Sequence, residues 1–217
     1  MIRQTSGRPA PATQSPPLVV IIDDDAAVRQ SLDSLFRSVG LATRLFAAPA
    51  ELLGAPLPDV PGCLILDVRL PGVSGLDFQD QLARQGLALP IVFMTGYGDI
   101  PMTVRAMKAG AVDFLSKPFR DQDMLDAVTA AIERDRARRS ATSILDDLRA
   151  AHGTLTARED EVMKHVVTGL MNKQIAGVLG LSEITVKIHR GNVMRKMGVR
   201  TLADLVRAAE ALGIGKS

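Results

Sequence analysis

The sequence predicts two domains of different class: an α/β domain built on a parallel sheet, followed by a small all-α domain. The first prediction rests on short apolar runs that alternate with stretches of helical periodicity between Leu18 and Phe119. Strands that alternate with helices are typical of a parallel sheet covered by helices on both faces. The second prediction rests on residues 154–217, where short helical stretches follow one another and glycines end them.

The composition of the 217 residues argues against a disulfide framework and against a membrane span. The single cysteine, Cys63, lies in an apolar run and is expected to be buried. No apolar run has the length of a membrane-spanning helix, and the first residues lack the apolar centre of a signal peptide. We therefore expect a cytoplasmic protein that makes no membrane contact.

The net charge of +2 is spread unevenly along the chain. Residues 18–119 carry more acids than bases, whereas residues 154–217 carry more bases than acids. A polyanion such as nucleic acid is therefore expected to bind the second domain.

The α/β domain is expected over residues 18–132, after a disordered tail over residues 1–17 that is rich in proline and polar residues. The apolar runs are continuous rather than alternating, which predicts strands buried on both faces. Gly40, Gly86 and Gly110 follow three of the helical stretches, as C-terminal caps do. The strands are expected at Leu18–Ile22, Ala42–Phe46, Cys63–Leu66, Ile91–Met94 and Val112–Leu115. The helices between them are expected at Val28–Val39, after Pro49, at Leu76–Gln85 and at Met102–Ala109.

One long helix is expected from Arg120 to His152, a stretch without proline or glycine. Apolar residues recur near both of its ends, and the charged segment Glu133–Ser140 separates them. The first third is expected to pack on the sheet, and the charged middle is expected to be solvated. We assign residues 133–153 to a helical linker between the domains. Two helices with a frayed joint remain the alternative.

The all-α domain is expected over residues 154–217. Thr156 and Glu159 have the spacing of a capping box, which predicts a helix start at Ala157. The expected helices are Ala157–Thr168, Lys173–Leu179, Glu183–Met197 and Leu202–Leu212.

Acidic side chains follow two of the predicted strands. Asp23, Asp24 and Asp25 come directly after Ile22, and Asp67 ends the third strand. In a sheet where these strands are neighbours, their carboxyl ends converge, and ligands bind there. Asp23, Asp24 and Asp67 would repel one another unless they held a hard cation such as Mg²⁺. Asp25 fits better as the N-cap of the next helix.

The remaining strand ends supply a hydroxyl and an ammonium. Thr95 ends the fourth strand and Lys117 follows the fifth. Together with Mg²⁺, these groups could meet the three oxygens of a phosphoryl group. A carboxylate can itself be the nucleophile and form an acyl phosphate.

The segments that carry these residues, DDD, LDVRLPGVSG and MTGYGDIPMTVRAMKAGAVDFLSKPF, resemble the receiver domain of two-component response regulators. The resemblance covers residues 18–132 and implies a flavodoxin/CheY-like sheet of strand order 2-1-3-4-5. It implies that Asp67 is the phosphoacceptor and that Thr95 and Phe114 move on phosphorylation, with Lys117 binding the phosphate. It also implies a cis peptide at Lys117-Pro118.

The same resemblance implies Mg²⁺ as the cofactor, with Mn²⁺ as a possible substitute. Asp24, Asp67 and the Arg69 backbone carbonyl would bind the ion directly. Asp23 would bind it through water.

The predicted helix Glu183–Met197 has one apolar face and one basic, polar face. At 100° per residue, Val186, Val193 and Met197 form a narrow apolar stripe. The opposite face suits a DNA major groove, where an aliphatic side chain can contact a thymine methyl group. An ordinary solvated face with one isoleucine is the alternative from this window alone.

Residues 154–213 resemble the LuxR/NarL-type helix-turn-helix. The resemblance implies that Glu183–Met197 is the recognition helix and that Leu202–Leu212 takes part in dimerisation. Lys187, Ile188 and Gly191 would face bases. Gly191 departs from some relatives that have a longer basic side chain there, so weaker or differently distributed readout is expected at this position. The candidates for phosphate contact are Thr185, His189, Lys173 and Arg195.

The combined pattern resembles the FixJ branch of response regulators, and StyR/TodT-type regulators of aromatic-hydrocarbon catabolism in particular. It implies a transcription regulator, not an enzyme, that a sensor histidine kinase phosphorylates. Phosphorylation would produce a homodimer that binds double-stranded promoter DNA and works with RNA polymerase. Two alternatives stay open. One is a phosphatase that uses Asp23-x-Asp25, and the other is a DNA-binding protein whose receiver has lost its phosphorylation.

Overall fold

The computed structural model describes residues 15–96 and 100–215, and the predicted disordered tail lies almost wholly outside these residues. The chain divides into two compact units, and the division falls inside helix α5, between Arg138 and Arg139. The predicted domain boundaries at 132 and 153 stay predictions. Among the described residues, no helix is both long enough and apolar enough to cross a membrane.

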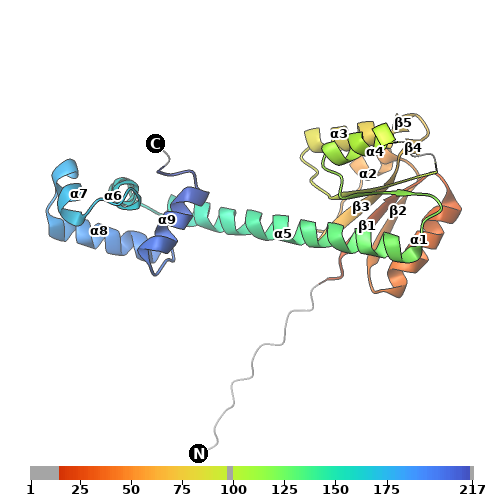
Figure 1. The fold of residues 1–217 in the computed structure, drawn as a ribbon. Coiled ribbons are helices and arrows are strands. Elements are labelled where there is room, and N and C mark those ends of the chain that lie inside the picture. The colour runs from red at the N-terminus through yellow and green to blue at the C-terminus, as the bar shows by residue number, and fades with distance from the viewer. Residues whose placement is uncertain (1–14, 97–99, 216–217) are drawn as a thin grey trace, which may run out of the picture. The chain divides into compact units, whose positions relative to one another are not determined.

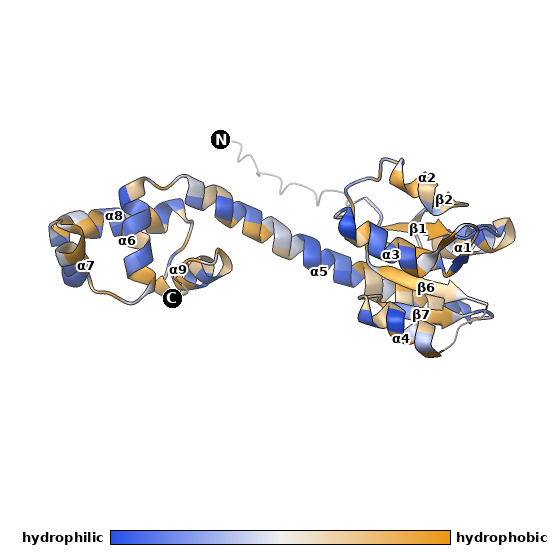
Figure 2. Cartoon of the chain, turned by 90° about the horizontal axis from the view of Figure 1, so that it is seen from above, coloured by the Kyte–Doolittle hydropathy of each residue, from blue (hydrophilic) through white to orange (hydrophobic). Residues whose placement is uncertain are grey.

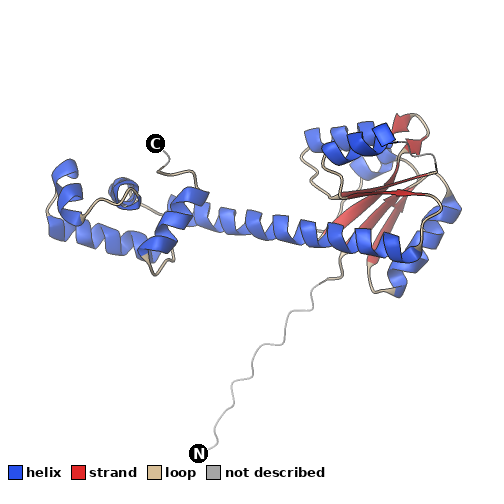
Figure 3. Ribbon diagram, in the orientation of Figure 1, coloured by secondary structure: helices blue, strands red, loops and turns tan. Residues whose placement is uncertain are grey.

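The first unit contains a five-stranded parallel sheet, seen edge-on in Figure 1 and as red arrows in Figure 3. The strand order is β2-β1-β3-β6-β7, which confirms the predicted order 2-1-3-4-5 for the main sheet. The strands are β1 (Leu18–Ile22), β2 (Ala42–Phe46), β3 (Gly62–Asp67), β6 (Ile91–Thr95) and β7 (Asp113–Ser116). A short antiparallel pair that was not predicted, β4 (Arg69–Leu70) and β5 (Val73–Ser74), follows β3.

Burial separates the central strands from the edge strands. Every residue of β1, β3 and β6 is buried, as the continuous apolar runs predict, and Figure 2 shows β1 and β6 in the hydrophobic colour. The edge strands β2 and β7 are only partly buried, so the prediction of burial on both faces is wrong for them. Each has a sheet neighbour on one side only.

Two hydrophobic cores cover the two faces of this sheet. Leu32 and Phe36 of α1 join Met124 and Val128 of α5 on one face. Residues of α2, α3 and α4, among them Phe78, pack on the other. The bounds of these helices are α1 (Ala26–Ser38), α2 (Pro49–Leu53), α3 (Gly75–Arg84), α4 (Ile100–Lys108) and α5 (Asp121–Gly153). Gly40, Gly86 and Gly110 have positive φ angles, in agreement with their predicted capping role.

Helix α5 is continuous over 33 residues, so the alternative of two helices is wrong. The expectation that its charged middle is solvated is wrong at Asp135, which is fully buried. The Asp135 carboxylate accepts a hydrogen bond from the Gly62 backbone N–H at 3.0 Å and one from Arg138 Nη2 at 2.7 Å. The bond from Gly62 anchors α5 to the amino end of β3.

The second unit packs the end of α5 and four further helices around one apolar core. The helices are α6 (Ala157–Val167), α7 (Asn172–Leu179), α8 (Glu183–Lys196) and α9 (Leu202–Ala211). The capping box of Thr156 and Glu159 is present as predicted. The Glu159 carboxylate also accepts a hydrogen bond from Lys196 Nζ at 2.6 Å, which ties the start of α6 to the end of α8.

Candidate functional site

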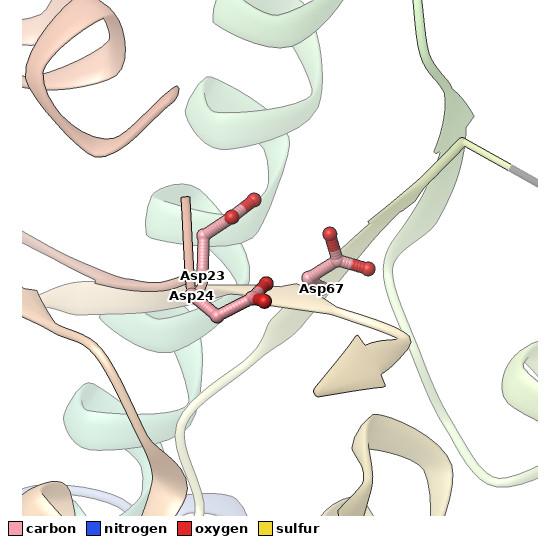
Figure 4. Close-up of side chains that lie close together, drawn as sticks. All are labelled: Asp23, Asp24 and Asp67. Carbon is pink, nitrogen blue, oxygen red and sulfur yellow. The ribbon is translucent and has the colours of Figure 1, made fainter. Parts of the chain in front are cut away.

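Three carboxylates meet where β1 and β3 end. The two strands pair in parallel with Ile22 opposite Leu66, so Asp23, Asp24 and Asp67 leave the sheet at the same edge. One carboxylate oxygen from each residue lies within 4.8 Å of the others, and Figure 4 shows the three side chains together. Asp23 is fully buried and Asp67 is 7% exposed, whereas Asp24 is exposed to solvent. The structure thus brings together the acids that the sequence predicts.

The Lys117 ammonium lies between two of these carboxylates. Its Nζ donates hydrogen bonds to Asp23 Oδ2 at 2.6 Å and to Asp67 Oδ2 at 2.7 Å. The peptide bond between Lys117 and Pro118 is cis, as predicted. One ammonium against three carboxylates leaves the cluster net negative when all three are ionised.

Burial and pairing shift the ionisation of this cluster. Burial raises the pKa of Asp23, because it disfavours the charged carboxylate, and the hydrogen bond from Lys117 opposes that shift. Burial alone would lower the pKa of Lys117, but its hydrogen bonds to Asp23 and Asp67 outweigh burial and raise it.

Backbone groups hold the two buried carboxylates in place. Asp67 Oδ1 accepts a hydrogen bond from the Arg69 backbone N–H at 2.9 Å. Asp23 Oδ1 accepts one from the Asp25 backbone N–H at 2.8 Å. The Asp25 side chain turns away to cap α1, where its Oδ1 accepts a hydrogen bond from the Ala27 N–H at 2.7 Å, as predicted.

Two residues that shape this site were not found from the sequence. The Arg29 guanidinium donates to the Asp23 backbone carbonyl at 2.5 Å. Gly75 starts α3 so close to β3 that an added Cβ would lie 2.4 Å from the Asp67 backbone oxygen. The only sequence indication of this close approach is the glycine itself, at the start of a predicted helix.

Thr95 and Phe114 lie on the two strands beyond β3. Thr95 ends β6 and is fully buried, and its carbonyl accepts a hydrogen bond from the Lys117 backbone N–H at 2.7 Å. The half-buried ring of Phe114 lies opposite Phe93 in the β6–β7 pairing, with ring centroids 6.2 Å apart. Both residues are therefore linked by backbone pairing to the strand end that carries Lys117.

The donor set fits a hard divalent cation. Mg²⁺ prefers oxygen ligands and retains several waters, so one or two carboxylates bind it directly. Within the described ranges, Asp23, Asp24 and Asp67 are the group of side chains placed to hold a metal ion. Arg69 starts β4 two residues after Asp67, and the role of its backbone carbonyl stays a prediction.

A pocket of about 380 Å³ adjoins this cluster on the α1 side. It is lined by apolar residues of α1 such as Val28 and Leu35, and by Lys117, Pro118 and Phe119 after β7. A partner bound there would contact the segment that carries Lys117.

Helix α8 of the second unit has the two faces that the sequence predicts. Val186, Val193 and Met197 are buried in the core of this unit. The opposite face is exposed at Lys187, Ile188, Gly191 and Arg195, and Lys173 is exposed on α7. Ile188 is 59% exposed, and Ile184 in the first turn of the same helix is 74% exposed.

Thr185 and His189, two of the residues predicted to contact phosphate, are only partly exposed. The Ser182 hydroxyl caps α8 by accepting a hydrogen bond from the Thr185 N–H at 3.1 Å, and the two hydroxyl oxygens lie 2.8 Å apart. His189 is only partly exposed, and its Nδ1 is buried without a hydrogen-bond partner among the described residues. The sequence places His189 at the border of the apolar stripe, and the structure agrees.

Comparisons with known proteins agree with both parts of this geometry. Residues 19–129 match the family described as "Response regulator receiver domain", and residues 153–209 match "Bacterial regulatory proteins, luxR family". The chain is 61% identical to "Nodulation protein W" of Bradyrhizobium diazoefficiens, over 91% of this chain and 87% of that protein. It is 47% identical to "Response regulator protein TodT" of Pseudomonas putida, over 90% and 86% of the two chains.

A solved structure of the response regulator StyR is similar over 90% of this chain and 98% of that one. The TM-score is 0.81 and the sequence identity is 48%. The predicted likeness to StyR/TodT-type regulators is confirmed.

Proposed function

Because the chain belongs to the response regulators that join a receiver domain to a LuxR-family DNA-binding domain, we propose that phosphorylation of Asp67 switches its binding to promoter DNA. The observation that carries the proposal is the placement of Asp67 beside Asp23, Asp24 and Lys117 at one edge of the sheet. The phosphoryl donor is a sensor histidine kinase.

Asp67 is the nucleophile of the phosphoryl transfer. A carboxylate oxygen attacks the phosphorus of the kinase phosphohistidine. The phosphorus–nitrogen bond breaks, its electron pair stays on the imidazole, and an acyl phosphate forms. Lys117 Nζ would donate to a phosphoryl oxygen, and its distance of 2.7 Å from Asp67 Oδ2 supports this role. The Arg69 N–H holds the other carboxylate oxygen and so fixes the direction of attack.

Asp24 and Asp67, with the Arg69 carbonyl, would hold Mg²⁺ directly, and Asp23 would act through water. Mn²⁺ is an expected substitute. When bound, the ion would neutralise negative charge on the phosphoryl oxygens. Asp24 is exposed, and backbone hydrogen bonds fix the neighbouring carboxylates of Asp23 and Asp67. Both observations support this assignment.

The kinase would approach through the pocket between α1 and the Lys117–Phe119 segment. The pocket has an apolar lining and lies beside the charged cluster. It therefore suits a kinase helix that packs its apolar face against the pocket and presents a phosphohistidine at the edge of that contact.

The switch runs through Thr95 and Phe114 to the surface of α4 and β7. Thr95 is buried at the site and Phe114 lies on the neighbouring strand, so a movement of the hydroxyl and ring would reach that surface. Helix α4 exposes Ile100, Val104 and Met107, which are four and three residues apart and share one face. We propose that this face forms the homodimer after phosphorylation.

The second unit binds double-stranded promoter DNA in the cytoplasm. Helix α8 would enter the major groove, with Lys187, Ile188 and the backbone at Gly191 near base edges. Lys173, Thr185 and Arg195 would contact phosphates, and His189 would do so only through its other ring nitrogen, since Nδ1 is buried. RNA polymerase is the expected further partner of such a promoter-bound dimer.

Several relatives are named transcriptional regulatory proteins, which favours this proposal over a phosphatase that uses Asp23-x-Asp25. In that alternative Asp25 would act as acid or base at the site. Its carboxylate instead accepts a hydrogen bond from the N-terminal turn of α1.

The test compares wild type with Asp67→Asn, each with acetyl phosphate and Mg²⁺. Gel filtration gives the oligomeric state, and a mobility-shift assay on promoter fragments gives DNA affinity. Wild type should dimerise and bind more tightly, and Asp67→Asn should do neither. An equal response of both proteins would contradict the proposal, and no response of either would favour a receiver that has lost its phosphorylation.

A further inference from the structure

The cations of the second unit differ in whether a carboxylate neutralises them. Among the described cations after residue 154, four form ion pairs, with N–O distances between 2.5 and 2.7 Å. The pairs are Arg158–Glu161, Lys164–Asp160, Lys196–Glu159 and Arg207–Asp204. They lie in α6, in α9 and between α6 and the end of α8, so these parts of the surface are close to neutral.

The other described cations of this unit after residue 154 have no acidic partner among the described residues, and they gather in one stretch of the chain. They are Lys173, Lys187, Arg190, Arg195 and Arg200, and Glu183 is the one acid between the first and the last of them. Arg190 is half-buried and donates to Asn172 Oδ1 at 3.2 Å, which links α8 to α7. Positive charge is thus concentrated on α7, α8 and the segment after α8.

Arg200 is the member of this group that lies neither on α8 nor among the predicted phosphate contacts. It lies in the connection between α8 and α9 and is exposed. The backbone on both sides of it is fixed: the Val199 N–H donates to the Met194 carbonyl at 3.0 Å, and Thr201 caps α9. The backbone of Arg200 is therefore fixed in the short connection just beyond the carboxyl end of α8.

Neutralising the partial negative charge at the end of α8 does not account for Arg200. Arg195 and Lys196 already occupy the last turn of α8, and Arg200 lies beyond its cap at Met197. Arg200 has no carboxylate partner among the described residues, so it does not make this part of the surface neutral. It extends the positive potential of the surface past the end of α8.

We propose that Arg200 contacts a DNA phosphate, and that α8 is thereby held to the sugar–phosphate backbone at both of its ends. About 14 Å of helix lies between Lys187 and Lys196 at a rise of 1.5 Å per residue. The major groove is about 12 Å wide. Cations that lie before and after this stretch of helix can therefore contact phosphates on opposite sides of the groove. The inference rests on the proposed binding of DNA by α8.

The test is the salt dependence of DNA binding, which reports the number of phosphates that cations neutralise. The probe is a fluorescein-labelled 30-base-pair duplex of mixed sequence, titrated with the full chain from about 50 to 200 mM KCl. Each phosphate contact adds about 0.9 to the slope of log K against log[salt]. Arg200→Gln should lower the slope by about 0.9, so that its affinity falls about 3.5-fold less than that of wild type over this range.

Three further variants make the result specific. Arg200→Lys keeps the charge and should keep the wild-type slope. Arg207→Gln removes one cation of the same unit that is paired with Asp204, and it should also keep the slope. Arg195→Gln removes a proposed phosphate contact of α8 itself and should lower the slope. Unchanged thermal unfolding of each variant shows that the fold is intact.

A wild-type slope in Arg200→Gln together with a lower slope in Arg195→Gln would overturn the role of Arg200 and leave DNA binding by α8 in place. Unchanged slopes in both variants, or a wild-type chain that does not bind the duplex, would overturn the proposed function and this inference with it.

Discussion

Lys117 Nζ lies 2.7 Å from Asp67 Oδ2, and the same ammonium lies 2.6 Å from Asp23 Oδ2. The ammonium therefore compensates two buried carboxylates that come from two different strands. The same contact places a cation beside the proposed phosphoacceptor before any phosphoryl group arrives.

Replacing Lys117 with Gln should destabilise the protein in the absence of Mg²⁺. The change leaves the fully buried Asp23 carboxylate and that of Asp67 without a cation, and breaking such a buried pair costs about 3 kcal/mol. Urea unfolding in EDTA measures this loss, and added Mg²⁺ should recover part of it. The matched control is Arg120→Gln, which removes an exposed ion pair with Asp123 and should change little. Equal losses in the two variants would contradict the bridging role.

Gly75→Ala should destabilise the first unit by about 2 kcal/mol and reduce labelling of Asp67. The added methyl group would lie 2.4 Å from the Asp67 carbonyl oxygen, so β3 and α3 must separate. Gly191→Ala is the matched control, because nothing lies within 4 Å of its added Cβ, and it should stabilise α8 by up to about 1 kcal/mol. Urea denaturation measures both changes. Loss of stability in Gly191→Ala would contradict the open space around the added Cβ.

The stability that Glu159 confers should depend on pH in acid. The hydrogen bond from Lys196, helped by the Thr156 backbone N–H, lowers the pKa of Glu159 to about 2 from an ordinary value near 4.5. The folded state therefore binds the proton less tightly than the unfolded state. The contribution of Glu159 is complete above pH 4.5 and is lost as the pH falls toward 2.

The measurement is the difference in unfolding free energy between wild type and Glu159→Gln, from urea titrations between pH 7 and pH 2.5. The difference should be constant down to about pH 5 and then shrink. A difference that does not vary with pH would show that the carboxylate charge is not what stabilises the start of α6.

Asp25→Ala should lower the unfolding free energy by about 1 kcal/mol and leave phosphorylation intact. The change removes the acceptor for the Ala27 N–H at the start of α1. Asp25→Asn retains an oxygen at the cap and should be close to wild type. Loss of labelling in both variants, with the fold intact, would favour the phosphatase alternative.

The sequence predicts what depends on local pattern. The apolar runs give the strands, Asp25 and Thr156 mark helix starts, and the position of Lys117 before Pro118 gives the cis peptide through the family resemblance. These features depend on neighbours in the chain or on a motif that can be read directly.

Contacts between distant residues could not be predicted in this way. Asp135 lies in a charged run that looks solvated, yet it accepts a hydrogen bond from Gly62, 73 positions away. The close approach of Gly75 to Asp67 depends on how α3 packs against β3. Ion pairing also decides which basic residues of the second unit are neutralised by a carboxylate. The net charge of the sequence does not show which residues are paired.

The most direct test of the central claim is to locate the acyl phosphate. Wild-type protein is incubated with acetyl phosphate and Mg²⁺ and then treated with borohydride, which reduces an aspartyl phosphate to homoserine, and peptide mass spectrometry finds the modified position. The account predicts homoserine at position 67, dependent on Mg²⁺ and absent from Asp67→Asn. Homoserine at position 23 or 25, or labelling that persists in Asp67→Asn, would contradict it.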